Sequence, residues 1–281
     1  MNYILLVISC LLNGLKSVYA KKSNGCLDEA HNIYTYNFYM FLVSFVIAGV
    51  FAIPSFALPS AFTLLLGALY GAALIFAQVF LIGAMKHGGV SVSTLFYSCG
   101  FLLPTFMGAI FYEESISLWQ YVGVALILAS FLVSTSRGEK TSPKWFLFAL
   151  AALLCNGAVG ILQKLFRMSA YKDEQSVFMM IAFLVGAILA FLLMPKKKPF
   201  LPSGKFMRTV AVSGLSLGLV NTINVYISGL LPAIVVFPSV NGGGIVTSAI
   251  LARILIGEKL SPKKTVGVIL GIAAICLIAI K

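Results

Sequence analysis

The chain has 281 residues, of which 60% are hydrophobic and only 10% are charged. Soluble globular domains carry about 25% charged residues, so this composition excludes the ordinary soluble class and predicts a membrane protein. The formal net charge of +12 does not indicate nucleic acid binding, because the Lys and Arg residues gather in short segments between apolar stretches. We therefore expect the lipid bilayer as a partner and no nucleic acid.

Ten apolar stretches are long enough, or nearly so, to cross a bilayer as helices. They cover residues 2–20, 34–53, 61–85, 90–111, 118–135, 145–166, 175–194, 207–228, 233–256 and 264–280. These stretches are too long and unbroken to be barrel strands, and they use nearly the whole chain. The predicted fold is an all-α integral membrane protein with ten transmembrane helices.

Polar side chains within the stretches are concentrated in six of them. In chain order the candidate substrate-binding residues are Asn13, Gln78, Tyr97, Asn156, Gln163, Lys164, Asn221, Asn224 and Asn241. Uncharged amides in a low-dielectric bundle need hydrogen-bond partners, which a cavity shared with a polar solute supplies. Interhelical hydrogen bonding is the alternative role for the amides. The other stretches, 34–53, 118–135, 175–194 and 264–280, are expected to face lipid or to brace the bundle.

Charged residues within the stretches are all basic. We expect Lys16 and Arg253 to reach the headgroups, because both lie near the end of a stretch. For Lys164 a headgroup position and a position facing the cavity remain open. All eight acidic residues lie in loops or at helix ends, which argues against exchange of protons for a cationic drug. The predicted solute is therefore small, polar, and neutral or anionic.

A helix break is predicted in the stretch 233–256. Pro238 removes a backbone donor, and Gly242–Gly244 lower the cost of leaving helical geometry. We expect the backbone between Ser239 and Gly244 to be the least regular part of this helix and to face the cavity. Close helix packing through glycine is the alternative role for these residues.

The chain contains two copies of one sequence pattern. Asn13-Gly14…Lys21 recurs as Asn156-Gly157…Lys164, and Glu114…Gly123-Val124 recurs as Glu258…Gly267-Val268, both at an offset of 143–144 residues. The predicted halves are residues 1–138 and 139–281. Because each half holds five spans, an odd number, the second half must be inverted relative to the first.

The orientation follows from the distribution of Lys and Arg. Loops 21–33, 86–89, 136–144, 195–208 and 257–264 contain fourteen of them, whereas the alternate loops and the C-terminus contain three. Cytoplasmic loops carry the excess of basic residues. We therefore predict a multi-pass protein of the cell membrane (plasma or inner membrane) with both termini on the outer side.

These motifs resemble the EamA-type members of the drug/metabolite transporter superfamily over essentially the whole chain. The resemblance is carried by Gly14, Lys21, Gly157, Lys164, Glu114, Ser117, Gly123, Gly257, Glu258, Leu260, Ser261, Gly267 and Gly271. It implies two inverted five-helix repeats and a transport function. It implies almost nothing about the substrate.

We therefore predict a secondary transporter that moves a small polar metabolite by alternating access. A non-transporting structural or sensory membrane protein is the main alternative, and a flippase for lipid-linked substrates or a membrane-embedded enzyme is a further one. The chain has two isolated His residues, five Cys without metal-ligand spacing and no converging carboxylates. We predict no enzyme, no catalytic residues, no metal and no cofactor, and the pattern does not indicate an oligomeric state.

Overall fold

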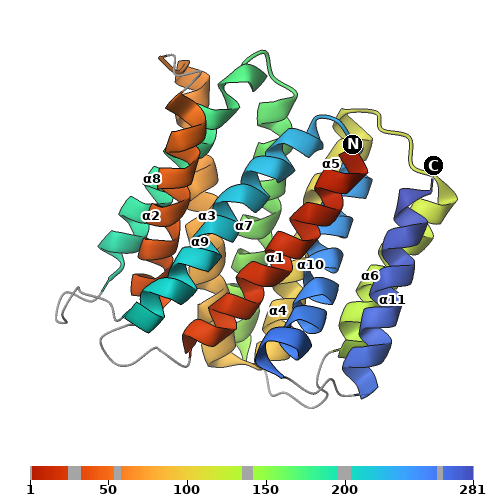
Figure 1. Cartoon of the computed structure of the whole chain (residues 1–281). Coiled ribbons are helices and arrows are strands. Elements are labelled where there is room, and N and C mark those ends of the chain that lie inside the picture. The colour runs from red at the N-terminus through yellow and green to blue at the C-terminus, as the bar shows by residue number, and fades with distance from the viewer. Residues whose placement is uncertain are drawn as a thin grey trace.

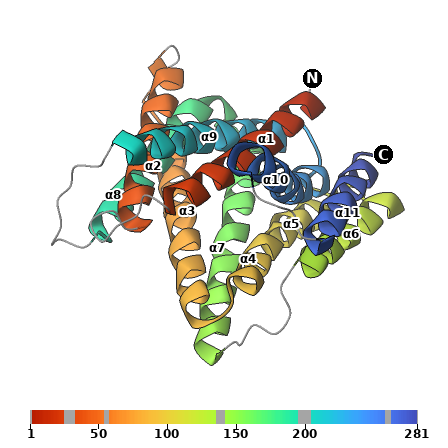
Figure 2. The ribbon, with the colours of Figure 1, turned by 60° about the horizontal axis from the view of Figure 1, so that its bottom comes forward.

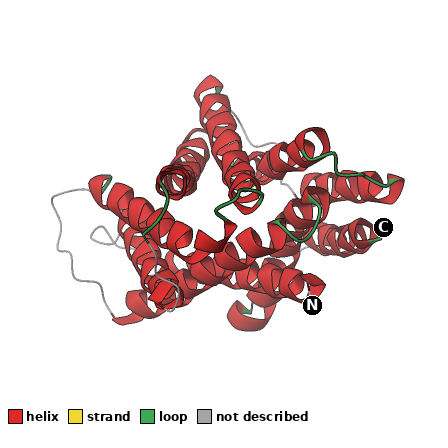
Figure 3. Cartoon of the chain, turned by 90° about the horizontal axis from the view of Figure 1, so that it is seen from above, coloured by secondary structure: helices red, strands yellow, loops and turns green. Residues whose placement is uncertain are grey.

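The computed structural model describes residues 2–24, 33–53, 58–134, 142–194, 204–257 and 262–280. All regular elements in these ranges are helical, as Figure 3 shows. They are α1 (Asn2–Asn24), α2 (Ile33–Ala52), α3 (Ala61–His87), α4 (Val90–Ser98), η2 (Cys99–Phe101), α5 (Leu102–Phe111), α6 (Leu118–Ser134), α7 (Pro143–Arg167), η3 (Lys172–Glu174), α8 (Gln175–Leu192), α9 (Gly204–Ser228), α10 (Ala233–Ile256) and α11 (Pro262–Ala279). The all-α class predicted from the sequence is confirmed.

Eight segments are long and apolar enough to cross a membrane, with α4, η2 and α5 together forming one of them. The helices α6 and α11 have shorter apolar runs. At 1.5 Å per residue, the 17 residues of α6 extend for about 25 Å, somewhat less than the roughly 30 Å of a bilayer core. Ten spans therefore remain a prediction. Figure 1 shows the N and C ends at the same end of the molecule, which an even number of crossings requires.

Local sequence signals explain where several helices begin and end. Ser60 and Ser142 cap α3 and α7, because their hydroxyl oxygens accept hydrogen bonds from the backbone N–H groups of Thr63 and Trp145. At the other end of a span, α10 is followed by Gly257 with φ 71°, a left-handed conformation that favours glycine.

The described helices form two large apolar cores and a small third cluster around Trp145. One core contains residues of α2, α3, α7, α8 and α9, and the rings of Phe166 and Phe178 stack in it with centroids 4.0 Å apart. The other contains residues of α1, α6, α10 and α11 together with Phe101 of η2. Helices from both halves of the chain contribute to each core. Large apolar side chains also cover much of the surface, as expected for contact with lipid.

Helix neighbours are paired in a way that matches a two-fold repeat. The helix α1 packs against α9 and α10, and its counterpart α7 packs against α3 and against the α4–η2–α5 segment. The pairs α2–α8 and α6–α11 each join a helix to its own counterpart. Figures 1 and 2 show α6 and α11 side by side at one edge of the molecule. The inverted relation stays a prediction, and the boundary between residues 138 and 139 lies outside the described residues.

The predicted break in α10 is wrong. The helix is continuous from Ala233 to Ile256, with Pro238 inside it. Its glycines serve close packing instead: a Cβ at Gly243 would lie 2.5 Å from Cys10 Sγ, and Gly244 faces the Asn13 amide. The interrupted span is the equivalent one in the first half, where the 3₁₀ turn η2 separates α4 from α5, three residues before Pro104.

The packing of α3 on α8 can be tested at Gly71. A Cβ at this glycine would collide with the Ala182 carbonyl group, a backbone group that cannot rotate away. We expect Gly71→Ala to destabilise the protein by about 1–3 kcal/mol, measured as a lower thermal unfolding temperature in detergent. The matched control is Gly49→Ala in α2, where a Cβ meets nothing within 4 Å. The control should be neutral or stabilising by up to about 1 kcal/mol, and equal effects of the two changes would contradict the packing.

Candidate functional site

A polar cavity of about 220 Å³ lies between the two halves of the chain. We call it the central cavity. Residues of α1, α2, α3, the α4–η2–α5 segment, α7, α9 and α10 line it. At roughly 30 Å³ per water molecule this is the volume of about seven waters, so it suits a small solute. Six of these spans were predicted to line the interior. The helix α2 was expected to face lipid or to brace the bundle; it packs against α8 and α9 and also contributes residues to the cavity wall.

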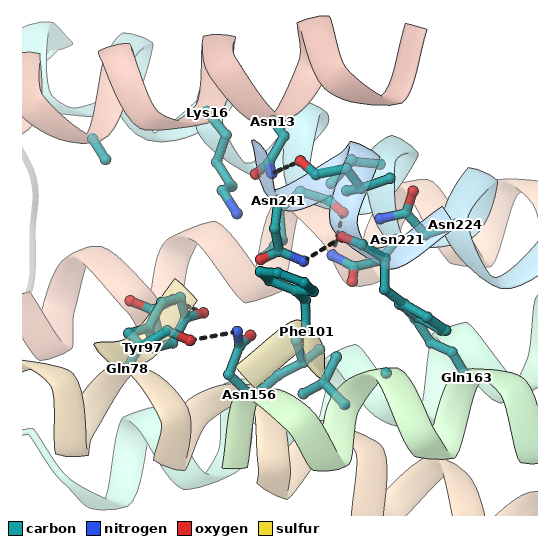
Figure 4. A pocket seen from close by; sticks show the side chains of 18 of the residues that line it. Asn13, Lys16, Gln78, Tyr97, Phe101, Asn156, Gln163, Asn221, Asn224 and Asn241 are labelled. Atoms are coloured by element: carbon teal, nitrogen blue, oxygen red, sulfur yellow. Dashed lines mark hydrogen bonds between the residues drawn. The ribbon is translucent and has the colours of Figure 1, made fainter. Parts of the chain in front are cut away.

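Eight of the nine sequence-predicted site residues line the central cavity. They are Asn13, Gln78, Tyr97, Asn156, Gln163, Asn221, Asn224 and Asn241, and Figure 4 shows them gathered around one space. The ninth, Lys164, does not line it. The structure therefore brings together amide side chains that are up to 228 residues apart in the sequence.

Asn13 and Asn156 occupy equivalent positions. The Asn13 Nδ2 donates to the Val240 carbonyl oxygen at 3.2 Å, and the Asn156 Nδ2 donates to the Tyr97 carbonyl oxygen at 2.9 Å. Donor and acceptor both shift by 143 residues between the two bonds, which is the offset of the sequence repeat. Each amide thus joins the first helix of one half to the fourth span of the other half while also lining the cavity.

Tyr70 links two of the predicted residues and was not identified from the sequence. Its hydroxyl accepts from Gln163 Nε2 at 2.7 Å and donates to Asn221 Oδ1 at 2.7 Å. The Tyr70 ring is fully buried against Phe178, 5.3 Å between centroids. This chain of bonds joins α7, α3 and α9 and holds both amides in place. A lone Tyr in an apolar stretch carried no signal of this role.

The remaining predicted residues differ in how many partners they have. Asn224 Oδ1 accepts from the Ser9 hydroxyl, so this amide also joins α9 to α1. Asn241 Nδ2 donates within its own helix to the Phe237 carbonyl oxygen at 2.9 Å. The Tyr97 hydroxyl accepts from Gln78 Nε2 at 3.4 Å. Asn241 is therefore the predicted residue whose side chain contributes least to joining helices.

Lys16 is the charged residue of the central cavity. Figure 4 shows its side chain extending from α1 toward Asn241. No Asp or Glu is among the described residues that line the cavity, so its one formal charge is positive. The expectation that Lys16 reaches the headgroups is therefore wrong. A signal was present in the sequence, since Lys16 follows Asn13 by three residues and so shares its helix face.

Asn37 of α2 is a second residue that the sequence analysis missed. Its side chain lines the central cavity, and the residue is only 2% exposed. Its Nδ2 group has no hydrogen-bond acceptor among the described residues. Buried side-chain donors in native proteins nearly always have a partner, so this unpaired amide is unusual among the residues that line the cavity.

A second hollow of about 540 Å³, which we call the vestibule, adjoins the central cavity. Asn13, Lys16, Gln78, Tyr97 and Asn241 line both spaces. The vestibule extends to Met85, two residues before the end of α3, and to Ser248 in the second half of α10. It therefore lies toward the end of the bundle where α3 ends with Lys86 and His87.

Lys164 is held at the opposite end of the bundle by a buried ion pair. Its Nζ lies 2.5 Å from Glu114 Oε1 and donates to the Ser228 carbonyl oxygen at 2.9 Å. The other Glu114 oxygen accepts from the Ala233 backbone N–H at 2.6 Å, at the start of α10. Glu113 before it has φ 50°, a left-handed conformation that is uncommon outside glycine. The cavity role predicted for Lys164 is thus corrected, because Glu114 and the end of α9 satisfy its charge and donors.

The ion pair of Lys164 and Glu114 connects four elements. It joins α7, the loop after α5, the end of α9 and the start of α10. The side chains are only 4% and 14% exposed, so the charge pair is largely shielded from water. Among the described residues, no cluster of three metal-ligating side chains is found. The arrangement can hold a small polar solute at the centre, reached from the vestibule side.

A helical membrane protein with a polar cavity between two half-chains is the class that the fold and the site define. The model of the EamA-like transporter family matches the chain over residues 1–136 and 143–280. The chain therefore belongs to the EamA-like transporter family.

One solved structure that is similar to the chain is described only as "Crystal structure of protein". Its TM-score is 0.76 at 15% sequence identity, and the match covers 99% of this chain and 98% of the other. At this identity the likeness shows the fold alone. No curated protein matches the chain.

The buried ion pair can be tested by removing one partner at a time. Lys164→Met leaves the Glu114 carboxylate buried without its partner, which should destabilise the protein by about 3–5 kcal/mol. Thermal unfolding of the purified variant measures this. The double variant Lys164→Met/Glu114→Gln should be more stable than Lys164→Met alone, because it removes the unpaired charge. Lys172→Met, at an exposed residue nearby in sequence, is the matched control and should change stability by less than about 0.5 kcal/mol.

Proposed function

We propose that this protein is a secondary transporter that moves a small polar solute, neutral or anionic, across the cell membrane by alternating access. The observation that carries the proposal is the central cavity, which both halves line with amide groups and which lies between a vestibule and the end with the buried ion pair. A small volume and many neutral hydrogen-bonding groups are what a site for a small polar solute requires. Membership of the EamA-like transporter family supports the same function.

The two ends of the pathway differ, and this difference supports alternating access. The ion pair of Lys164 and Glu114 lies at one end, which we take to be the closed one, whereas the vestibule lies toward the other end. Transporters built from inverted repeats exchange the states of the two ends while the site stays near the middle. In the proposed orientation the basic loops and the vestibule face the cytoplasm, and both termini lie outside. The described conformation is then the one that faces the cytoplasm.

Asn241 offers the cleanest test of solute binding by the amides. Asn241→Ala removes an amide from the cavity wall without removing a bond between helices. Losing one neutral hydrogen bond to the solute should cost about 0.5–1.5 kcal/mol, hence a two- to tenfold higher half-saturation concentration. The measurement is counterflow of radiolabelled polar metabolites into proteoliposomes. Asn156→Ala and Asn224→Ala should weaken uptake as well, but each also loses a bond to another helix.

The control for this prediction is Thr222→Ala. The Thr222 hydroxyl makes the same kind of bond within its own helix, to the Gly218 carbonyl oxygen, and the residue does not line the cavity. Its uptake should equal that of the wild type. If no polar metabolite is exchanged by wild-type proteoliposomes, the protein is a non-transporting member of the family and the proposal fails.

Cysteine labelling tests whether the ion pair controls access at the closed end. In a variant without the native cysteines, Ser248→Cys in the vestibule should react with a membrane-impermeant maleimide, and the fully buried Ser228→Cys should not. Adding Glu114→Gln weakens the ion pair, so labelling of Cys at 228 should rise and labelling at 248 should fall. Glu113→Gln, at the exposed neighbouring carboxylate, is the matched control and should change neither. Unchanged labelling with Glu114→Gln would show that the ion pair does not control access.

A further inference from the structure

We propose that the solute is a small organic monoanion whose carboxylate is bound jointly by the Lys16 ammonium and the Asn37 amide. The inference deepens the proposed transport function and rests on the same cavity. It commits to an anion, and to two donors that come from α1 and α2.

Lys16 supplies the charge. Its ammonium makes no hydrogen bond and no ion pair with any residue that the structure describes, although Lys16 lines a cavity whose wall is built from seven helical segments. An ammonium group inside a membrane bundle is unfavourable unless a counter-charge or several oxygen atoms surround it. Lys164, the other cation deep in the chain, has both its carboxylate and its carbonyl partner. The contrast indicates that the partner of Lys16 arrives as a ligand.

Asn37 supplies the second donor. Asn37 is among the residues that line the cavity, and its Nδ2 has almost no accessible surface and no acceptor among the described residues, so its side chain must turn toward the cavity to reach the solute. A carboxylate has two oxygen atoms and can accept from two donors at once, one charged and one neutral. Lys16 and Asn37 are therefore complementary to one carboxylate, whereas a neutral solute would leave the ammonium without a counter-charge.

The charge balance indicates a single negative charge on the solute. The described lining of the cavity contains one cation and no carboxylate, so a monoanion makes the complex neutral. A dianion such as malonate would keep one uncompensated charge in the low-dielectric bundle. The Asn241 Oδ1 atom accepts no hydrogen bond from the described residues, so the rest of the solute should carry a donor such as a hydroxyl group.

Lys16 also lies on the route into the cavity. It lines the vestibule as well as the central cavity, together with Asn13 and Asn241. A solute that enters from the vestibule side meets the ammonium first, and the same positive charge repels cationic solutes. Lys16 is thus placed to select by charge before the amides select by shape.

The test compares acids with their own amides. Purified wild-type protein is heated with acetate, lactate or 3-hydroxybutyrate, and with acetamide, lactamide or 3-hydroxybutyramide, at equal concentration and pH 7. At least one acid should raise the unfolding temperature more than its amide, because a ligand that binds the folded state stabilises it. Malonate, which is a dianion at pH 7, should stabilise less. Equal stabilisation by acid and amide, or none by any of the acids, overturns the proposal.

Variants locate the effect. Lys16→Gln should weaken binding of the acid about tenfold or more, since bonds to charged groups contribute more than neutral ones, and Lys16→Arg should keep part of it. Asn37→Asp places a carboxylate beside the solute and should abolish acid binding. Lys22→Gln is the matched control: Lys22 is exposed near the end of the same helix, beside the Tyr19 ring, and acid binding should be unchanged. Acid binding that survives both Lys16→Gln and Asn37→Asp overturns the proposal.

Failure to fold, failure to transport and failure of the binding proposal give different results. If Lys16→Gln does not yield folded protein, the acid–amide comparison on the wild type and the Lys16→Arg variant still decide the outcome. If acids bind through Lys16 but proteoliposomes exchange none of them, the proposed transport function fails and the binding site stands. If a neutral solute is exchanged equally by wild type and Lys16→Gln, the transport function stands and this inference fails.

Discussion

The structure depends on two close helix crossings, and the same kind of hydrogen bond, from an Asn amide to a backbone carbonyl, stabilises both. At each crossing the amide of Asn13 or Asn156 donates to a backbone carbonyl of the opposing span, and glycines let the backbones approach. A Cβ at Gly14 would collide with Thr247, and one at Gly157 would collide with Leu103. In a bilayer, where lipid is as apolar as the helices, such close packing and interhelical bonds replace the hydrophobic drive toward association. Because each crossing joins opposite halves, neither half forms its core alone.

The central cavity follows from these crossings. Asn13 and Asn156 line it from both sides, and their bonded partners on the fourth spans line it too, as Tyr97 and Val240. Most polar groups at the cavity wall have hydrogen-bond partners within the protein, whereas the Lys16 ammonium and the Asn37 Nδ2 have none among the described residues. The apolar cores lie to either side of the cavity, between α2, α3 and α8 and between α6, α10 and α11. The same contacts therefore stabilise the bundle and keep its centre polar.

The sequence contained enough to predict the helical class, the two copies and eight of the residues that line the cavity. Long apolar stretches and repeated motifs are one-dimensional signals, and amides are rare enough in such stretches to mark the interior. These signals do not show which side chains on different helices contact each other. Lys164 and Glu114 are 50 residues apart and belong to separate motifs, so nothing in their spacing indicated an ion pair. The glycines of α10 were assigned to a helix break, and Asn37 of α2 was missed. Conformational propensity alone does not show which neighbouring helix a residue contacts.

The two copies agree at some positions that line the cavity and differ at others. At an offset of 143 residues, Asn13 matches Asn156 and Gln78 matches Asn221, and all four line the cavity. Yet Lys16 matches Val159, and Gln163 matches Ala20, although all of these also line it. A second lysine at position 159 would place two like charges in a cavity of about 220 Å³, which is strongly unfavourable in a low dielectric. A single solute also presents different groups to the two halves. Under the proposed function, Lys16, where the two copies differ, selects the solute by charge, whereas Asn13 and Asn156, where they agree, join the helices.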